Sequence, residues 1–119
     1  MAKLNKLTEE FLNGLIEIEL ILSLMLFKKK SFQEKGFAYF VEYKKNETIV
    51  SFLFGPSDWD VEMIVNTYKR KYAFKDLLQI QEILKWVNEN RYKQIGERDI
   101  KNELFWFVEL LKFSLPFIE

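Results

Sequence analysis

The chain has 119 residues, 49% of them hydrophobic and 17% aromatic, and its 18 basic side chains balance 18 acidic ones. This composition excludes intrinsic disorder and predicts a single domain, residues 1–119, with a hydrophobic core. Cys and His are both absent. Their absence excludes disulfides, thiolate nucleophiles, most zinc sites and histidine acid–base catalysis. The zero net charge gives no general attraction to nucleic acid or to an anionic membrane.

The composition also bears on compartment and source. Lack of Cys fits a reducing cytoplasm, and the excess of Lys over Arg is typical of an AT-rich bacterial genome. The apolar run 20–27 has the length of a signal-peptide core. However, Glu17 and Glu19 precede it, and Lys28 to Lys30 stand where a cleavage site would need small residues. We therefore expect a cytoplasmic protein without a membrane segment.

Residues 7–27 are predicted to form the first helix. Thr8 is a suitable N-cap, and the three lysines after the run suit the negative end of the helix dipole. One face collects apolar side chains at helical spacing: Phe11, Leu15, Ile18, Leu22, Met25 and Leu26. The second half of the helix is apolar on nearly every side. A further helix of the chain or a second subunit is therefore expected to cover it.

Residues 37–65 are predicted to form three antiparallel strands, 37–43, 48–54 and 59–65. The turn lengths pair Tyr43 with Thr48 and Phe54 with Trp59. Alternation then makes one face almost wholly apolar, while the other face mixes apolar residues with carboxylates. A slip of one residue would bury those carboxylates, which is costly enough to hold the register.

The rest of the chain adds a short extended piece near 72–74, which could be a fourth strand. A helix follows from Asp76 to about Asn90. A last helix begins at Glu97 or Asp99, and Pro116 is expected to end it. This order predicts an α+β fold: a three- or four-stranded antiparallel meander flanked by one N-terminal and two C-terminal helices.

Carboxylates on the mixed face of the sheet are the main candidates for function. Glu42, Asp60 and Glu62 share this face, and Asp58 lies at its rim. Paired carboxylates can act in glycoside hydrolysis or bind a hard cation, but so short a chain leaves little room for a sugar cleft and shows no convergent ligand spacing. We predict no catalytic residue, metal or cofactor. A solvated polar face and a partner-binding patch both remain open as interpretations.

Two other segments have structural explanations. Residues 54–59 combine strong turn residues with an aromatic pair, and Ser57 has no evident base. The basic run 69–71, flanked by two tyrosines, is interpreted as a solvated loop because the chain has no net positive charge. Neither segment therefore adds a predicted chemical function.

The size, the order of elements, the lack of catalytic residues and the acidic strand positions Asp60 and Glu62 resemble those of small α+β immunity proteins, with which bacteria neutralise their own toxins. The resemblance implies a non-enzymatic inhibitor that occludes a partner protein. In this hypothesis Glu42, Asp58, Asp60 and Glu62 meet cationic groups of the partner, and Phe40 anchors the contact.

Two alternatives remain open. The chain could form a structural homo-oligomer through the spare apolar surface of its first or last helix, with Leu20, Leu24, Trp106 and Leu110 as the candidate residues. It could instead bind a small ligand in an aromatic pocket between helix and sheet, lined by Tyr39, Tyr43 and Trp59.

Overall fold

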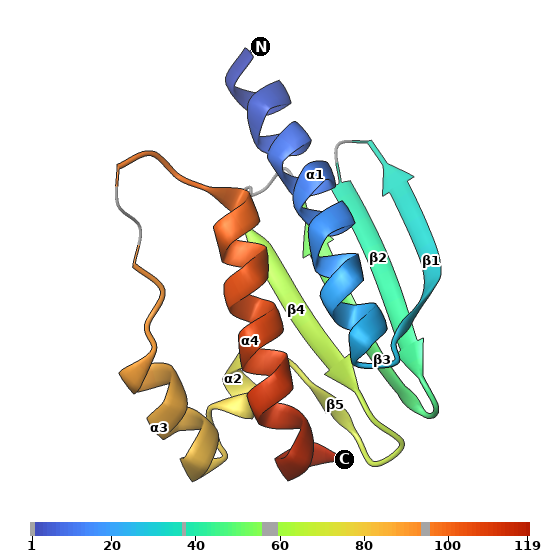
Figure 1. Cartoon of the computed structure of the whole chain (residues 1–119), viewed down its shortest axis with the longest axis vertical. Coiled ribbons are helices and arrows are strands. Elements are labelled where there is room, and N and C mark those ends of the chain that lie inside the picture. Colours follow the sequence, from blue (N-terminus) through green and yellow to red (C-terminus); the bar gives the residue numbers. More distant parts are fainter. Residues whose placement is uncertain (1, 37, 56–59, 94–95) are drawn as a thin grey trace.

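A computed structural model describes residues 2–36, 38–55, 60–93 and 96–119. Five antiparallel strands pair in the order β1-β2-β3-β4-β5, and the two long helices, α1 and α4, lie together on one side of this sheet (Figure 1). The predicted α+β class and meander are confirmed. The elements are α1 (Ala2–Leu24), β1 (Lys28–Lys35), β2 (Ala38–Lys45), β3 (Thr48–Phe54), β4 (Val61–Asn66), β5 (Lys71–Tyr72), α2 (Phe74–Leu77), α3 (Gln81–Glu89) and α4 (Ile100–Ile118).

The core lies between the apolar face of the sheet and the two long helices. Phe11 of α1 stacks on Phe54 of β3 with ring centroids 4.9 Å apart. The predicted split between the two sheet faces is therefore correct. The buried hydrophobic residues of the sheet all belong to the predicted apolar face: Val41, Tyr43, Val50, Phe52, Phe54, Val61, Met63 and Val65.

The strand register differs from the prediction by two residues. Lys45 pairs with Thr48, so the hairpin turn contains only Asn46 and Glu47, and the predicted pair of Tyr43 with Thr48 is wrong. Asn46 has a φ of 53°, in the left-handed region that tight hairpins need. The same shift applies between β3 and β4. Because side chains alternate with a period of two, this shift leaves every residue on its predicted face.

The first strand was not predicted, and the end of α1 was placed too late. Leu26 takes a φ of 72°, which stops the helix and turns Phe27 into the core. Lys28 to Lys30 then begin β1 and do not cap a helix. β1 is an edge strand with almost every residue exposed, so it lacks the apolar alternation by which a strand is recognised.

The C-terminal third also departs from the prediction. The expected helix from Asp76 to Asn90 is two helices, α2 and α3, and Asp76 lies inside α2, where it accepts a hydrogen bond from the Ala73 N–H at 2.8 Å. Of the two predicted starts of the last helix, Glu97 and Asp99, Asp99 is the N-cap of α4. Pro116 does not end that helix, which continues to Ile118. Among the described residues, no helix is both long and apolar enough to cross a bilayer.

Candidate functional site

The face of the sheet away from α1 and α4 is the candidate interaction surface, here called the open face. Its central cross-strand row joins Phe40, Leu53 and Glu62 on three neighbouring strands. Phe40 and Leu53 are half-buried and Glu62 is exposed. The open face therefore offers apolar contact area next to a carboxylate, as the sequence predicts.

A surface hollow of about 360 Å³ lies at one end of the open face. It brings together three of the predicted partner-binding residues, Phe40, Asp60 and Glu62. Glu62 makes no hydrogen bond or ion pair with another described residue, so its charge is available to a ligand. The lining residues are Gln33, Lys35, Ala38, Tyr39, Phe40, Leu53, Phe54, Gly55, Asp60 and Glu62.

Glu42 lies on the open face but is occupied by contacts within the sheet. Its Oε1 accepts a hydrogen bond from the Ser31 hydroxyl at 2.8 Å and lies 3.4 Å from the Lys30 ammonium. Both partners belong to β1, the strand that the sequence did not predict. Glu42 therefore ties β1 to β2 and lines no part of the hollow. Asp58, the other predicted rim residue, lies outside the described residues.

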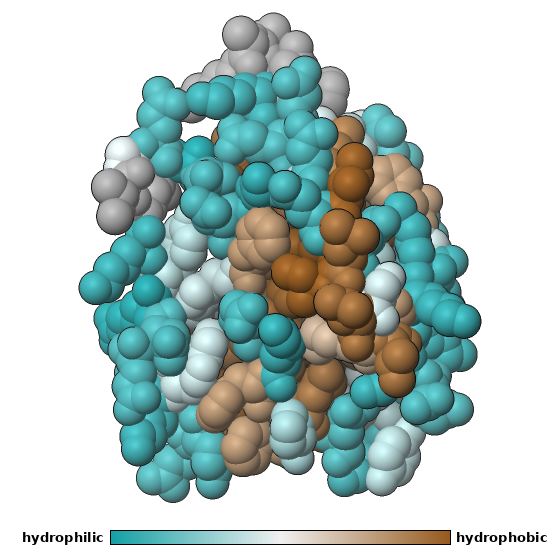
Figure 2. Space-filling view, in the orientation of Figure 1, coloured by the Kyte–Doolittle hydropathy of each residue, from teal (hydrophilic) through white to brown (hydrophobic). Residues whose placement is uncertain are grey.

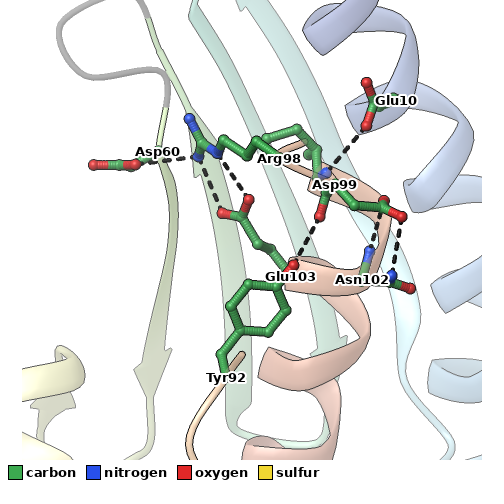
Figure 3. Close-up of polar contacts among 8 residues, drawn as sticks. Glu10, Asp60, Tyr92, Arg98, Asp99, Asn102 and Glu103 are labelled. Carbon is green, nitrogen blue, oxygen red and sulfur yellow. Dashed lines mark hydrogen bonds and ion pairs between the residues drawn. The ribbon is translucent and has the colours of Figure 1, made fainter. Parts of the chain in front are cut away.

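Asp60 belongs to a cluster centred on Arg98 (Figure 3). The guanidinium of Arg98 donates two hydrogen bonds to Glu103, at 2.8 and 3.0 Å, and lies 3.1 Å from the Asp60 carboxylate. Hydrogen bonding to Glu103 raises the pKa of Arg98, against the opposing effect of burial. The Asp60 side chain is 63% exposed, so its ion pair stabilises little and can be exchanged for a ligand's cation.

The approach of Arg98 to Asp60 could not be predicted from the sequence. The two residues are far apart in the chain, and neither belongs to a periodic pattern that would join them. Glu103 is five residues beyond Arg98, in the first turn of α4. The contact between Arg98 and Glu103 is therefore the part of the cluster that closeness in the sequence could suggest. The cluster joins the segment before α4 to the start of β4.

A second hollow, of about 580 Å³, lies beside the outer edge of β4 and is here called the edge groove. Aromatic rings form its wall: Trp106 lies 6.1 Å from Phe74 and 5.2 Å from Phe107 between ring centroids. The complete lining is Asp60, Val61, Glu62, Met63, Ile64, Ala73, Phe74, Lys75, Tyr92, Glu103, Trp106 and Phe107. Within the described ranges, no three acidic side chains converge to hold a metal ion.

The predicted aromatic pocket is not assembled by the described residues. Tyr43 is buried beneath α1, where its hydroxyl donates a hydrogen bond to Glu19 at 2.8 Å, and it lines neither hollow. Burial and this hydrogen bond both raise the pKa of Tyr43. Tyr39 lines the hollow of the open face. Trp59 lies outside the described residues.

The residues predicted for self-association divide into two groups. Leu20 and Leu24 are 71% and 86% exposed, and an apolar band follows α1 across the surface (Figure 2). Leu110 is fully buried, so its inclusion was wrong. Trp106 is half-buried in the wall of the edge groove. Of the four predicted residues, the two on α1, Leu20 and Leu24, are therefore the ones that offer exposed apolar surface.

Comparison with models of protein families, with curated proteins and with solved structures finds no match to this chain. The resemblance to immunity proteins accordingly stays a prediction. What the surface can bind is inferred below from its own geometry and charge.

Proposed function

We propose that this chain is a non-enzymatic, cytoplasmic interaction protein of the immunity type, which occludes a partner protein with the open face of its sheet. The observation that carries this proposal is the hollow in which half-buried Phe40 and Leu53 lie beside the carboxylates of Asp60 and Glu62. An apolar floor with charges at its margin is the usual arrangement of a protein-binding surface.

The charges favour a partner with a cationic contact surface. Glu62 is exposed and has no partner among the described residues, and the largely exposed carboxylate of Asp60 forms an ion pair with Arg98. A Lys or Arg of the partner can reach both carboxylates without stripping water from a deeply buried charge. Such pairs speed encounter and select the partner, while Phe40 supplies desolvated contact area.

The experiment begins with capture of the partner from the native host and its purification. Its affinity is then measured for the wild type and for the Asp60→Lys/Glu62→Lys double variant. We expect a loss of about 100-fold or more, because two favourable charge contacts become repulsive. If the partner is a toxin, co-expression of the wild type should suppress its toxicity and co-expression of the variant should not.

The matched control is Glu9→Lys/Glu89→Lys, which changes the net charge equally at two exposed helical positions away from the hollow. We expect this control to bind within about threefold of the wild type, since a distant charge alters only long-range attraction. Equal affinity for the wild type and for both folded variants would refute the proposal.

A specific observation favours self-association as a second function. Ile16, Leu20 and Leu24 follow one another at four-residue spacing on α1 and are 65%, 71% and 86% exposed. Large side chains in a continuous exposed row are typical of helix–helix interfaces. Sedimentation at micromolar concentration should show a dimer that Leu20→Lys/Leu24→Lys dissociates. A wild type that stays monomeric would exclude this function.

A further inference from the structure

The outer edge of β4 is only partly paired. β5 has two residues and pairs with Val65 and Asn66, whereas β4 begins at Val61. In the described part of the chain, no strand lies beside residues 61–64 on this edge. The edge groove occupies that place.

Backbone hydrogen-bonding groups of β4 point into this groove. Thr67, the residue after β4, donates its N–H to the Arg70 carbonyl at 2.9 Å, which fixes the direction of its backbone groups toward β5. These groups alternate along a strand, so Val65, Met63 and Val61 direct theirs to the same side. The groups of Val65 meet β5. Those of Val61 and Met63 have no strand to pair with in the described part of the chain.

The side walls of the groove differ in chemistry. The side chains of Val61 and Met63 turn toward the core side, where the rings of Trp106 and Phe107 wall the groove. Glu62 points to the opposite, open face. A strand added to β4 would therefore place alternate side chains against aromatic rings and beside an exposed carboxylate.

We propose that the edge groove binds an extended peptide segment of a partner protein as an added strand of the sheet. Its apolar side chains pack on Trp106 and Phe107, and the Lys or Arg between them lies opposite Glu62. Backbone bonds to Val61 and Met63 supply affinity, and the alternating side chains supply specificity. This proposal rests on the proposed function only for the existence of a protein partner.

The test uses the full chain as bait for a phage-displayed library of random dodecapeptides. We expect enrichment of peptides in which a basic residue stands between two apolar residues. The best of these is synthesised and its contact is mapped by amide hydrogen exchange. On saturation, the Val61 and Met63 amides should exchange at least about tenfold more slowly, because each gains a hydrogen bond.

Three variants then separate backbone pairing from side-chain contact. Val61→Pro removes one outward N–H at the first residue of an edge, where proline is tolerated, and should weaken the peptide about tenfold. Val61→Ala keeps the N–H and should bind within about threefold of the wild type. Glu62→Lys should weaken the basic peptide about tenfold, and a peptide with Glu in place of its basic residue should recover that loss.

Failure of this proposal is distinguishable from failure of the proposed function. Phe40→Ser alters the open face alone, so it should spare the peptide even if it abolishes binding of the native partner. The edge proposal would be overturned if no peptide were enriched, or if the enriched peptides lacked a basic residue between two apolar ones. It would also be overturned if the bound peptide left the Val61 and Met63 amides unprotected. Protection of those amides in the free chain at high concentration would also overturn it, since a second copy would then cover the edge. The exchange data decide the matter even if Val61→Pro does not fold.

Discussion

Gly14→Ala tests whether the close approach of α1 and α4 depends on the missing side chain. A Cβ at this position would lie 2.7 Å from Cδ1 of Leu104 and 3.3 Å from Cα of Lys101. At the first distance the Cβ would clash with the Leu104 methyl group, and at the second it would press on the backbone of Lys101. Leu104 is fully buried, so its methyl group cannot move without displacing its own neighbours. The two helices would have to separate locally.

The expected magnitude is a difference between two opposing effects. Alanine is favoured over glycine inside a helix by about 1 kcal/mol. Extra atoms in a well-packed core cost about 1–3 kcal/mol. We therefore expect Gly14→Ala to lower the free energy of unfolding by about 1 kcal/mol, measured by urea denaturation.

Two comparisons check the reasoning. Asn13→Ala changes the neighbouring exposed residue, so it should gain helix propensity without any clash and stabilise by about 0.5 kcal/mol. In a Leu104→Ala background the closest clash is gone, and Gly14→Ala should become stabilising. If Gly14→Ala alone stabilised the chain as Asn13→Ala does, the inferred contact between α1 and α4 would be refuted.

Three further predictions concern polar side chains with a defined hydrogen-bond partner. Burial and its hydrogen bond to Glu19 raise the pKa of Tyr43 above its ordinary 10.0. Above pH 10 the unfolded chain therefore loses this proton first, and the free energy of unfolding should fall by up to about 1.4 kcal/mol per pH unit. Tyr43→Phe should flatten this fall, as measured by urea denaturation at several pH values. Arg98→Met should lower the free energy of unfolding by about 2 kcal/mol, because it leaves the Glu103 carboxylate unpaired, and Glu103→Leu in the same chain should restore part of the loss. Asp99→Ala removes the side chain that accepts from the Asn102 N–H and should lower the thermal stability of α4 by about 1 kcal/mol in circular dichroism melts.

The fold could be predicted where a pattern repeats along the chain. Alternation in β2, β3 and β4 assigns each residue to its face even though the pairing was displaced by two positions. The assignment of residues to faces tolerates this error, because burying the charge of Glu62 or Glu42 would cost far more free energy than a turn that is two residues shorter or longer. The same parity placed Phe40, Asp60 and Glu62 around one hollow.

The parts that could not be predicted lack a local signal. β1 contacts a single strand and is exposed on both faces, so solvent permits almost any polar residue there. The ion pair of Arg98 with Asp60 depends on where the segment before α4 lies, which tertiary packing determines. The contacts of Glu42 could not be predicted for the same reason. Its partners Ser31 and Lys30 belong to β1, the strand that the sequence pattern does not reveal.

The two edges of the sheet are protected in different ways, and the difference gives a final prediction. β1 carries several lysines and an irregular register between Lys29 and Ser31, both of which discourage pairing with another chain. On the unpaired part of β4, from 61 to 64, Glu62 is the single charged residue. Glu62→Val should therefore increase light scattering with concentration, relative to the wild type, because an apolar open edge recruits further strands. Gln33→Val places the same apolar side chain on the lysine-protected edge, where the lysine charges remain, and should leave scattering unchanged. Equal scattering from the two variants would show that β4 is no more open to pairing than β1.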